Sequence, residues 1–224
     1  VLRLRRTKKV RFFRDLTLHS KIAITATLIL ILAGAVLIFA FEYNNPQTIK
    51  DYTLLQKIEV SLFQSVTTRT AGFATVPQEN LTNASAFVCL LLMFIGGSPV
   101  GTAGGIKTVT FAVLVASAFA SVRNKENTEV FGRQLTKQAV SKAVAVTCMS
   151  FIIMFTSTVF LSAVTEANAL DLIYETVSAT ATVGLTRNFT ASLSSIGKLI
   201  IIVTMYLGRV GPISLAVAFK RSKD

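Results

Sequence analysis

Two hexapeptides share one order of residue types, with threonine first and third, glycine fifth and an apolar residue last. They are TRTAGF, from Thr68 to Phe73, and TATVGL, from Thr180 to Leu185. A site that takes a cation out of water needs backbone carbonyl oxygens that face one axis. Glycine allows backbone conformations that a Cβ atom would forbid, and it lets chains approach closely. The hexapeptides are therefore predicted to line a cation pathway.

The two hexapeptides belong to a longer internal repeat. A shift of 112 residues, which places Thr68 on Thr180, also places Gly72 on Gly184 without a gap. The same shift places FIG, which begins at Phe94, on YLG. Similarity at a fixed spacing indicates a duplicated unit. The letters TVG in the second hexapeptide also match the start of the potassium-channel filter sequence TVGYG.

The segments around the hexapeptides are apolar enough to lie in lipid. Of the 224 residues, 52% are hydrophobic and 15% charged, and the mean hydropathy is +0.60. A membrane-spanning helix needs about 20 mostly apolar residues. We therefore expect an all-α membrane protein with four spans. Three stretches are long enough and a fourth is long but interrupted: Ile22 to Phe41, Ala139 to Val164, Ile196 to Phe219 and, interrupted, Ala84 to Val122.

Lysine and arginine predict how these spans are oriented. Residues 1–21 contain eight, residues 122–142 five and residues 220–224 three, whereas the connections 42–83 and 164–198 contain three and two. Cationic loops are retained on the cytoplasmic side. We expect a multi-pass protein of the cell membrane with both termini of this segment cytoplasmic. The net charge of +12 is mostly this asymmetry, and a nucleic-acid-binding patch is the weaker alternative.

A short apolar segment precedes each hexapeptide. Leu54 to Val66 and Leu170 to Ala179 are too short to cross a bilayer as helices, and they run into threonine- and glycine-rich stretches that do not continue a helix. Irregular backbone at membrane depth is tolerated where it is buried in protein or lines a water-filled cavity. We expect two re-entrant pore helices, whose C-terminal dipole ends attract a cation.

A glycine-rich stretch interrupts the second span. Residues 96–105 contain five glycines and Pro99 after about a dozen apolar residues. Such a run reaches roughly 18 Å of a hydrocarbon core that is roughly 30 Å thick, so we expect this span to break inside the membrane. A simple helix kink is the alternative. A phosphate-binding loop is disfavoured, because Ile106 separates Gly105 from Lys107 and no soluble strand precedes the glycines.

Four motifs together resemble the Trk/Ktr/HKT superfamily of cation transporters, and most closely its bacterial membrane subunit of the TrkH/KtrB type. They are SVTTRTAGF from Ser65, GGSPVGTAGGIKT from Gly96, SATATVGL from Ser178 and YLGRVGP from Tyr206. Members of this family have four helix–pore-loop–helix repeats around one pseudo-fourfold pore, and the two repeats here resemble the third and fourth. The resemblance implies a fragment with a basic cytoplasmic segment at 1–21, a third-type repeat at 22–121, a cytoplasmic loop at 122–136 and a fourth-type repeat at 137–224.

The resemblance implies potassium uptake through a carbonyl selectivity filter above a gating loop. Glycine at 72 and 184 goes with potassium selectivity, while sodium translocation, or a packing subunit without transport, are the alternatives. The threonines could supply oxygens to the ion or serve ordinary helix packing. The filter would comprise Thr68, Arg69, Thr70, Ala71, Gly72, Thr180, Ala181, Thr182, Val183 and Gly184. The gating loop would comprise Gly96, Gly97, Ser98, Gly101, Thr102, Gly104, Gly105 and Lys107.

Three charged residues stand out singly. Arg209 lies between two apolar runs, and a charge inside a span usually faces a cavity or a partner. The resemblance implies that Arg209 forms a barrier to cations in the pore. The alternative is that its side chain snorkels to the inner interface.

Arg69 would repel the ion if it faced the axis, so we expect it to brace the filter from behind, with a carboxylate such as Glu59 or Glu79 as its partner. Glu175 is predicted in the second pore helix, either concentrating cations at the outer mouth or solvated.

The sequence shows no catalytic constellation. His19, Cys89 and Cys148 form no nucleophile–base pair and no metal cluster, and the cysteines are expected to pack among apolar side chains. We therefore expect that the chain is not an enzyme and holds no cofactor. K⁺, or Na⁺, is expected only as the transported ion. The resemblance implies a homodimer of the full-length subunit and a cytosolic nucleotide-binding regulatory ring of the KtrA/TrkA type. Its docking surface would be residues 122–142 and the terminal KRSKD, for which orientation and anionic lipid are the alternative explanation.

Overall fold

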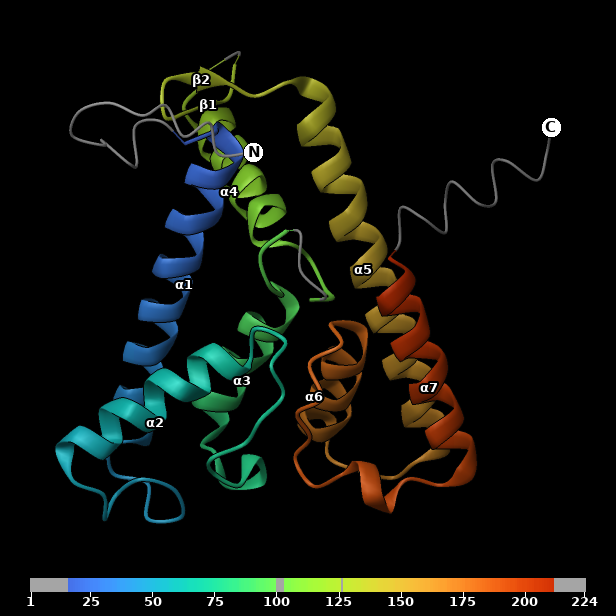
Figure 1. Cartoon of the computed structure of the whole chain (residues 1–224). Helices are drawn as coiled ribbons and strands as arrows, with labels where there is room; N and C mark the ends of the chain where they lie inside the picture. Colours follow the sequence, from blue (N-terminus) through green and yellow to red (C-terminus); the bar gives the residue numbers. More distant parts are fainter. Residues whose placement is uncertain (1–15, 100–102, 126, 212–224) are drawn as a thin grey trace, which may run out of the picture.

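The computed structural model describes residues 16–99, 103–125 and 127–211 of the chain. The described residues are mostly helical, with a single two-stranded antiparallel hairpin (Figure 1). This confirms the expected all-α class. The helices are α1 (Leu18–Glu42), α2 (Leu54–Thr67), α3 (Asn83–Phe94), α4 (Thr108–Val122), α5 (Lys137–Val164), α6 (Ala169–Thr180) and α7 (Ser195–Val210); the hairpin is β1 (Glu129–Val130) with β2 (Arg133–Gln134), and two short 3₁₀ turns are Gln78–Asn80 and Thr190–Ser192.

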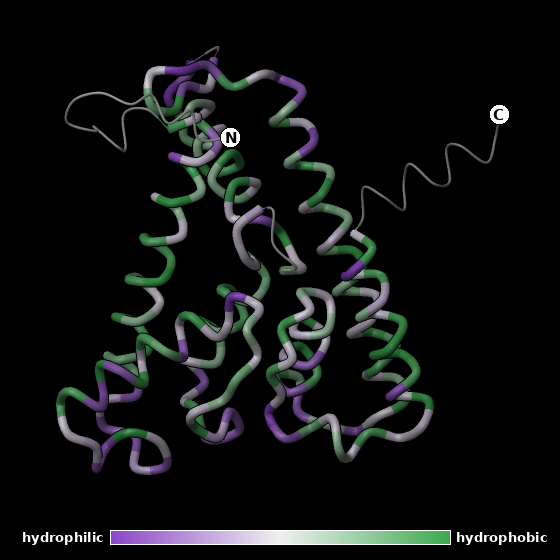
Figure 2. The backbone as a smooth tube through the Cα atoms, in the orientation of Figure 1, coloured by the Kyte–Doolittle hydropathy of each residue, from purple (hydrophilic) through white to green (hydrophobic). Residues whose placement is uncertain are grey.

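Within the described ranges, two helices are long and apolar enough to cross a membrane. α1 has 25 residues and α5 has 28, and their most apolar windows are only 17% and 22% buried inside the protein. A core helix of a soluble protein would be mostly buried, so this exposure favours lipid as the surroundings. Figure 2 shows hydrophobic residues along α1, α5 and α7 and hydrophilic residues at the two ends of the molecule.

The expected break in the second span is confirmed. α3 ends at Phe94 and α4 begins at Thr108, so the span is divided into a helix of 12 residues and a helix of 15 residues. The two ends of the intervening loop are held together, because the amide of Ile106 donates to the carbonyl of Phe94 at 3.2 Å and the amide of Thr108 donates to the carbonyl of Gly97 at 3.1 Å. The described ends of the intervening loop therefore lie side by side, which the alternative of a simple kink does not explain.

The two short segments before the hexapeptides are helices, as predicted. α2 begins with a capping box in which Thr53 and Gln56 satisfy each other's backbone amides, and it ends at Thr67. α6 ends at Thr180. Each hexapeptide therefore begins where a short helix ends. The last span, expected to run to Phe219, is described as α7 only up to Val210, and its remainder lies outside the described residues.

The described residues form two apolar cores, of which one is shared by the two halves and the other lies within the second half. The buried members of the shared core come from α1 and α3 in the first half and from α6 and the second hexapeptide in the second half, including Ile38, Met93, Tyr174 and Val183. Cys89 is buried there, as expected of a packing residue, whereas Cys148 is exposed on α5. This shared core lies between α3 of the first half and α6 of the second, which contact each other.

Candidate functional site

The two hexapeptides have the same backbone geometry as well as the same sequence pattern. Thr70 and Gly72 have φ values of 70° and 79°, and Thr182 and Gly184 have φ values of 55° and 95°. The residue between them, Ala71 or Val183, has no positive φ. Residues of alternating hand turn successive peptide groups toward one side of the chain. The third and fifth positions of each hexapeptide are therefore left-handed, in a form suited to presenting neighbouring carbonyls together.

The hexapeptides touch each other at their glycines. A Cβ atom added to Gly72 would lie 2.2 Å from the carbonyl oxygen of Val183, and one added to Gly184 would lie 4.0 Å from the Cα atom of Gly72. Position 72 therefore needs glycine for space and for its left-handed φ. Position 184 has room for a side chain and needs glycine only for its backbone conformation.

The threonine hydroxyls divide into two kinds. Those of Thr68 and Thr180 donate to the carbonyls of Ser65 and Thr176 in their own helices, at 2.8 Å each. Each of these two hydroxyls is therefore held against its own helix, and its oxygen keeps lone pairs that can still accept a further contact. Thr182 instead lies against the glycine-rich loop, because a Cβ atom on Gly104 would meet its hydroxyl at 2.3 Å.

The glycine-rich loop lies directly against both hexapeptides. A Cβ atom on Gly97 would lie 3.6 Å from the carbonyl oxygen of Arg69, and one on Gly104 would lie 2.6 Å from that of Ala181. The described part of the loop thus reaches the first hexapeptide at one end and the second at the other. Gly101 and Thr102 lie outside the described residues.

Arg69 ties the first hexapeptide to this loop. Its Nη2 atom donates to the carbonyl of Gly96 and to the hydroxyl of Thr108, at 2.8 Å each. The predicted partners Glu59 and Glu79 are wrong: both are exposed, and the single ion pair of the described chain joins Arg187 and Asp171. Glu59 lies more than two turns back along α2 and Glu79 follows the hexapeptide, whereas the Arg69 guanidinium bonds to Gly96 and Thr108 at the ends of the loop.

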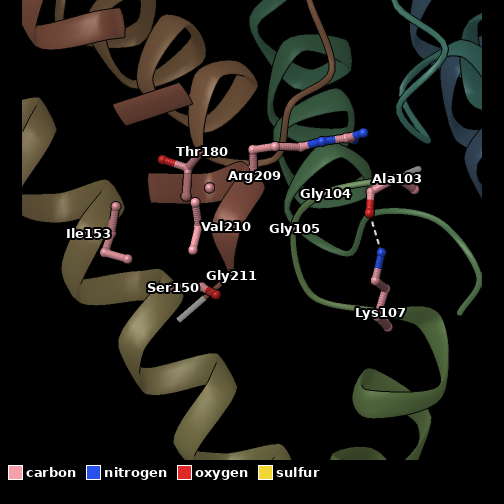
Figure 3. A pocket seen from close by; sticks show the side chains of 11 residues that line it. Ala103, Gly104, Gly105, Lys107, Ser150, Ile153, Thr180, Arg209, Val210 and Gly211 are labelled. Carbon is pink, nitrogen blue, oxygen red and sulfur yellow. Dashed lines mark hydrogen bonds between the residues drawn. The ribbon is translucent and has the colours of Figure 1, made fainter. Parts of the chain in front are cut away.

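A cavity of about 390 Å³ lies beside the loop. It is bounded by the loop, by α5 at Ser150 and Ile153, and by the end of α7 (Figure 3). Lys107 and Arg209 both line it, and the Nζ atom of Lys107 donates to the carbonyl of Ala103. Arg209 lies in the last turn of α7, where it faces a cavity, as a charge within a span is expected to do. Two positively charged side chains therefore line one space beside the glycine-rich loop.

Glu175 lies in α6, as predicted, and its side chain is 5% exposed. Its carboxylate accepts hydrogen bonds from the hydroxyls of Thr186 and Thr190. The alternative of a solvated surface carboxylate is therefore wrong. Glu175 holds the segment that follows the second hexapeptide, which the sequence did not indicate.

The site contains residues that sequence reasoning missed. Gln64, Gln78 and Tyr174 are buried around the hexapeptides and bonded to one another, and Arg187 joins them from the second half. One signal was available, because a glutamine inside a short apolar helix must find a partner if it is buried. In the described ranges, no three histidine, cysteine or acidic side chains gather in a group that could hold a metal ion.

Comparison with known proteins identifies the family. The model of the TrkH family, described as a cation transport protein, matches residues 2–223. The chain belongs to the TrkH family. The resemblance read from its motifs is thereby confirmed, and because the family consists of cation transport proteins, the expectation that the chain is not an enzyme is confirmed as well. Membership also implies a membrane protein.

Relatives in the TrkH family carry related names. The chain is 38% identical over 216 residues to the Ktr system potassium uptake protein B of Bacillus subtilis, which covers 96% of this chain and 48% of that protein. It is 35% identical over 202 residues to the potassium/sodium uptake protein NtpJ of Enterococcus hirae, covering 88% of this chain and 45% of that protein. The chain spans about half the length of the curated relatives it matches.

A solved structure confirms the fold. The chain is similar to the potassium transporter TrkH of Vibrio parahaemolyticus, with a TM-score of 0.71 and 18% sequence identity over 89% of this chain and 43% of that one. At this identity the similarity shows the fold alone. The all-α architecture described above is therefore that of a TrkH-family membrane protein.

Proposed function

We propose that this chain forms part of a potassium-translocating pore whose selectivity filter includes residues 68–72 and 180–184. The observation that carries the proposal is the meeting of two hexapeptides with the same left-handed positions, each at the C-terminal end of a short helix. Carbonyl oxygens in such a filter replace the hydration shell of the ion, and the helix ends add their partial negative charge. The names of relatives as potassium uptake proteins support potassium as the ion.

We further propose that the glycine-rich loop is the gate of this pore. Its contacts with both hexapeptides support this role, because an ion leaving the filter would meet the loop next. Lys107 and Arg209 would form an electrostatic barrier around the cavity beside it. The loop has to move for an ion to pass, and its glycines lower the conformational energy of such a movement because glycine adopts many backbone conformations.

Ion flux through the complete transporter in proteoliposomes tests the filter. We expect potassium flux to exceed sodium flux in the wild type. In the Gly184→Ser variant we expect the ratio of potassium to sodium flux to fall roughly tenfold, the change that corresponds to about 1.4 kcal/mol. Gly132→Ser is the matched control, because Gly132 also has a positive φ (+70°) and open space but lies in the hairpin. A Gly184→Ser variant that keeps the wild-type preference would contradict the proposal.

Sodium translocation is the second candidate function. It is favoured by one relative, which is named a potassium/sodium uptake protein. The same flux measurement decides between the two, because equal or greater sodium flux in the wild type would support the sodium pathway. Flux of neither ion would indicate a packing subunit.

We also propose that the full-length subunit is a homodimer and that its inner face docks a cytosolic nucleotide-binding ring. The inner face is assigned from charge: α1 begins at the end of the molecule where the hairpin lies (Figure 1), and Arg123, Lys125 and Arg133 are exposed there. The naming of relatives as parts of a Ktr system supports a partner. A monomeric mass of the complete subunit in detergent would reject the dimer. The terminal KRSKD, residues 220–224, lies outside the described residues.

Co-purification with the regulatory subunit tests docking. We expect binding to fall at least about tenfold when Arg123, Lys125 and Arg133 are all replaced by glutamine, because each surface charge contributes up to about 1 kcal/mol. The matched control replaces Lys50 and Lys198 by glutamine; both are exposed, Lys50 before α2 and Lys198 in the first turn of α7, on the side assigned as outer. Binding by the triple variant that equals binding by the wild type would reject this surface as the docking site.

A further inference from the structure

A buried polar network lies around the first hexapeptide, and none of the roles proposed above uses it. Gln64 on α2, Gln78 at the start of a 3₁₀ turn and Tyr174 on α6 are 0%, 2% and 0% exposed. Burying three polar side chains costs free energy unless each finds a partner. Each of them does, so the network is a formed structure and needs an explanation.

Gln78 joins the two pore helices through its side chain. Its Oε1 atom accepts from Nε2 of Gln64 at 2.6 Å and from the hydroxyl of Tyr174 at 3.0 Å. Its Nε2 atom donates to the carbonyl of Val76 at 2.8 Å and to Oε1 of Gln64 at 3.2 Å. A single amide therefore connects α2 of the first half to α6 of the second.

Arg187 holds the same turn from its backbone side. Its Nη1 atom donates to the carbonyl of Gln78 at 2.9 Å and its Nη2 atom donates to that of Glu79 at 3.1 Å. Its Nε atom is bonded to Asp171 on α6 at 2.7 Å, and the side chain is 10% exposed. The segment that follows the first hexapeptide is thus held from both sides by residues of the second half.

We propose that these four residues, Gln64, Gln78, Tyr174 and Arg187, form an inter-repeat clamp that sets the spacing of the two hexapeptides and so the ion preference of the pore. The clamp is a set of positioning residues, and the inference rests on the proposed filter. Both hexapeptides are continuous with the pore helices that the clamp joins, and they meet at Gly72 and Val183.

Hydrogen bonds suit this task better than apolar packing does. Helices in lipid lack a hydrophobic force that would fix how they sit against each other, so packing and interhelical hydrogen bonds set their positions. Carbonyl filters distinguish ions by the size of the site or by the number and strength of the carbonyl dipoles. Both properties change when one hexapeptide moves relative to the other. Loosening the clamp should therefore change the choice of ion more than the amount of transporter that folds.

Tyr174→Phe tests the clamp in the complete transporter, because it removes one hydroxyl and keeps the ring in the core. We expect the ratio of potassium to sodium flux to fall roughly fivefold, the change that one hydrogen bond of typical net strength produces. Tyr206→Phe is the matched control, since Tyr206 is 67% exposed on α7. If the fluxes of both ions and the melting temperature fall together while the ratio stays constant, the network is only structural and the inference is overturned.

Two further variants keep the test decisive. Arg187→Lys retains a charge for Asp171 but cannot donate from a planar fork to both carbonyls, so we expect it to lower the same ratio. The double variant Tyr174→Phe with Gln64→Leu should lower the ratio by less than the product of the single effects, because the two residues act through one amide; independent effects would overturn the clamp.

Gly184→Ser in the same series separates the clamp from the filter. If Gly184→Ser changes the flux ratio and Tyr174→Phe does not, the clamp is rejected and the filter stands. If neither variant changes the ratio, the proposed filter fails and the clamp fails with it.

Discussion

Gly72→Ala is expected to lower potassium flux through the complete transporter by at least about tenfold, and by more than Gly184→Ala does. The added methyl group would lie 2.2 Å from the carbonyl oxygen of Val183, so the two hexapeptides must move apart. Left-handed φ adds a backbone cost of roughly 1–2 kcal/mol for a residue with a Cβ atom. At Gly184 only the backbone cost applies, because the nearest atom is 4.0 Å away.

The difference between the two glycines makes this prediction specific. Potassium flux in proteoliposomes is measured for both alanine variants and for Gly132→Ala, in which the left-handed backbone cost occurs without a clash. Melting temperatures of the purified proteins show whether each variant folds. Equal flux losses at positions 72 and 184 would mean that the contact between Gly72 and Val183 is not used in conduction.

Arg209→Ala is expected to raise basal cation flux several-fold in the absence of a regulatory subunit. Arg209 and Lys107 line the same cavity next to the glycine-rich loop, and a cation crossing that space is repelled by both. Removing a unit charge about 4 Å from the ion would lower the barrier by about 1 kcal/mol even in a water-like medium, and by more in protein. Each 1.4 kcal/mol corresponds to roughly tenfold in rate.

The charge itself is tested by two controls. Arg209→Lys keeps the positive charge and should leave basal flux close to that of the wild type. Lys198→Ala removes an exposed charge from the opposite end of α7 and should have no effect. If Arg209→Ala leaves basal flux unchanged, the side chain does not face the conduction pathway.

Features that depend on neighbouring residues were predictable from the sequence. Both short helices predicted before the hexapeptides appear within one residue of their predicted ends, because a short apolar run that meets a Thr/Gly-rich stretch carries its own stop signal. The broken span followed from counting the apolar residues before Gly96 against the thickness of a bilayer. That glycine would be needed for its backbone conformation was expected at both Gly72 and Gly184, where φ is positive.

Features that depend on which distant segments meet were not predictable. Arg69 had charged residues nearby in the sequence, yet its guanidinium bonds to neutral acceptors at Gly96 and Thr108, which the fold of the loop brings close. The sequence was compatible with a solvated Glu175, but the segment after the second hexapeptide lies over its carboxylate and Thr186 donates a hydrogen bond to it. Local pattern does not encode these distances.

The sequence by itself determined the repeat, the apolar segments, the two short helices before the hexapeptides and the family, because each rests on residue order within a short window or on matching residue types. Only the tertiary structure decided that the two hexapeptides touch, that Lys107 and Arg209 line one cavity, and that Gln78 joins helices whose linked residues are 96 positions apart. The physical reason is that a hydrogen bond or a backbone contact requires a separation of a few ångströms, and packing of the whole chain sets that separation.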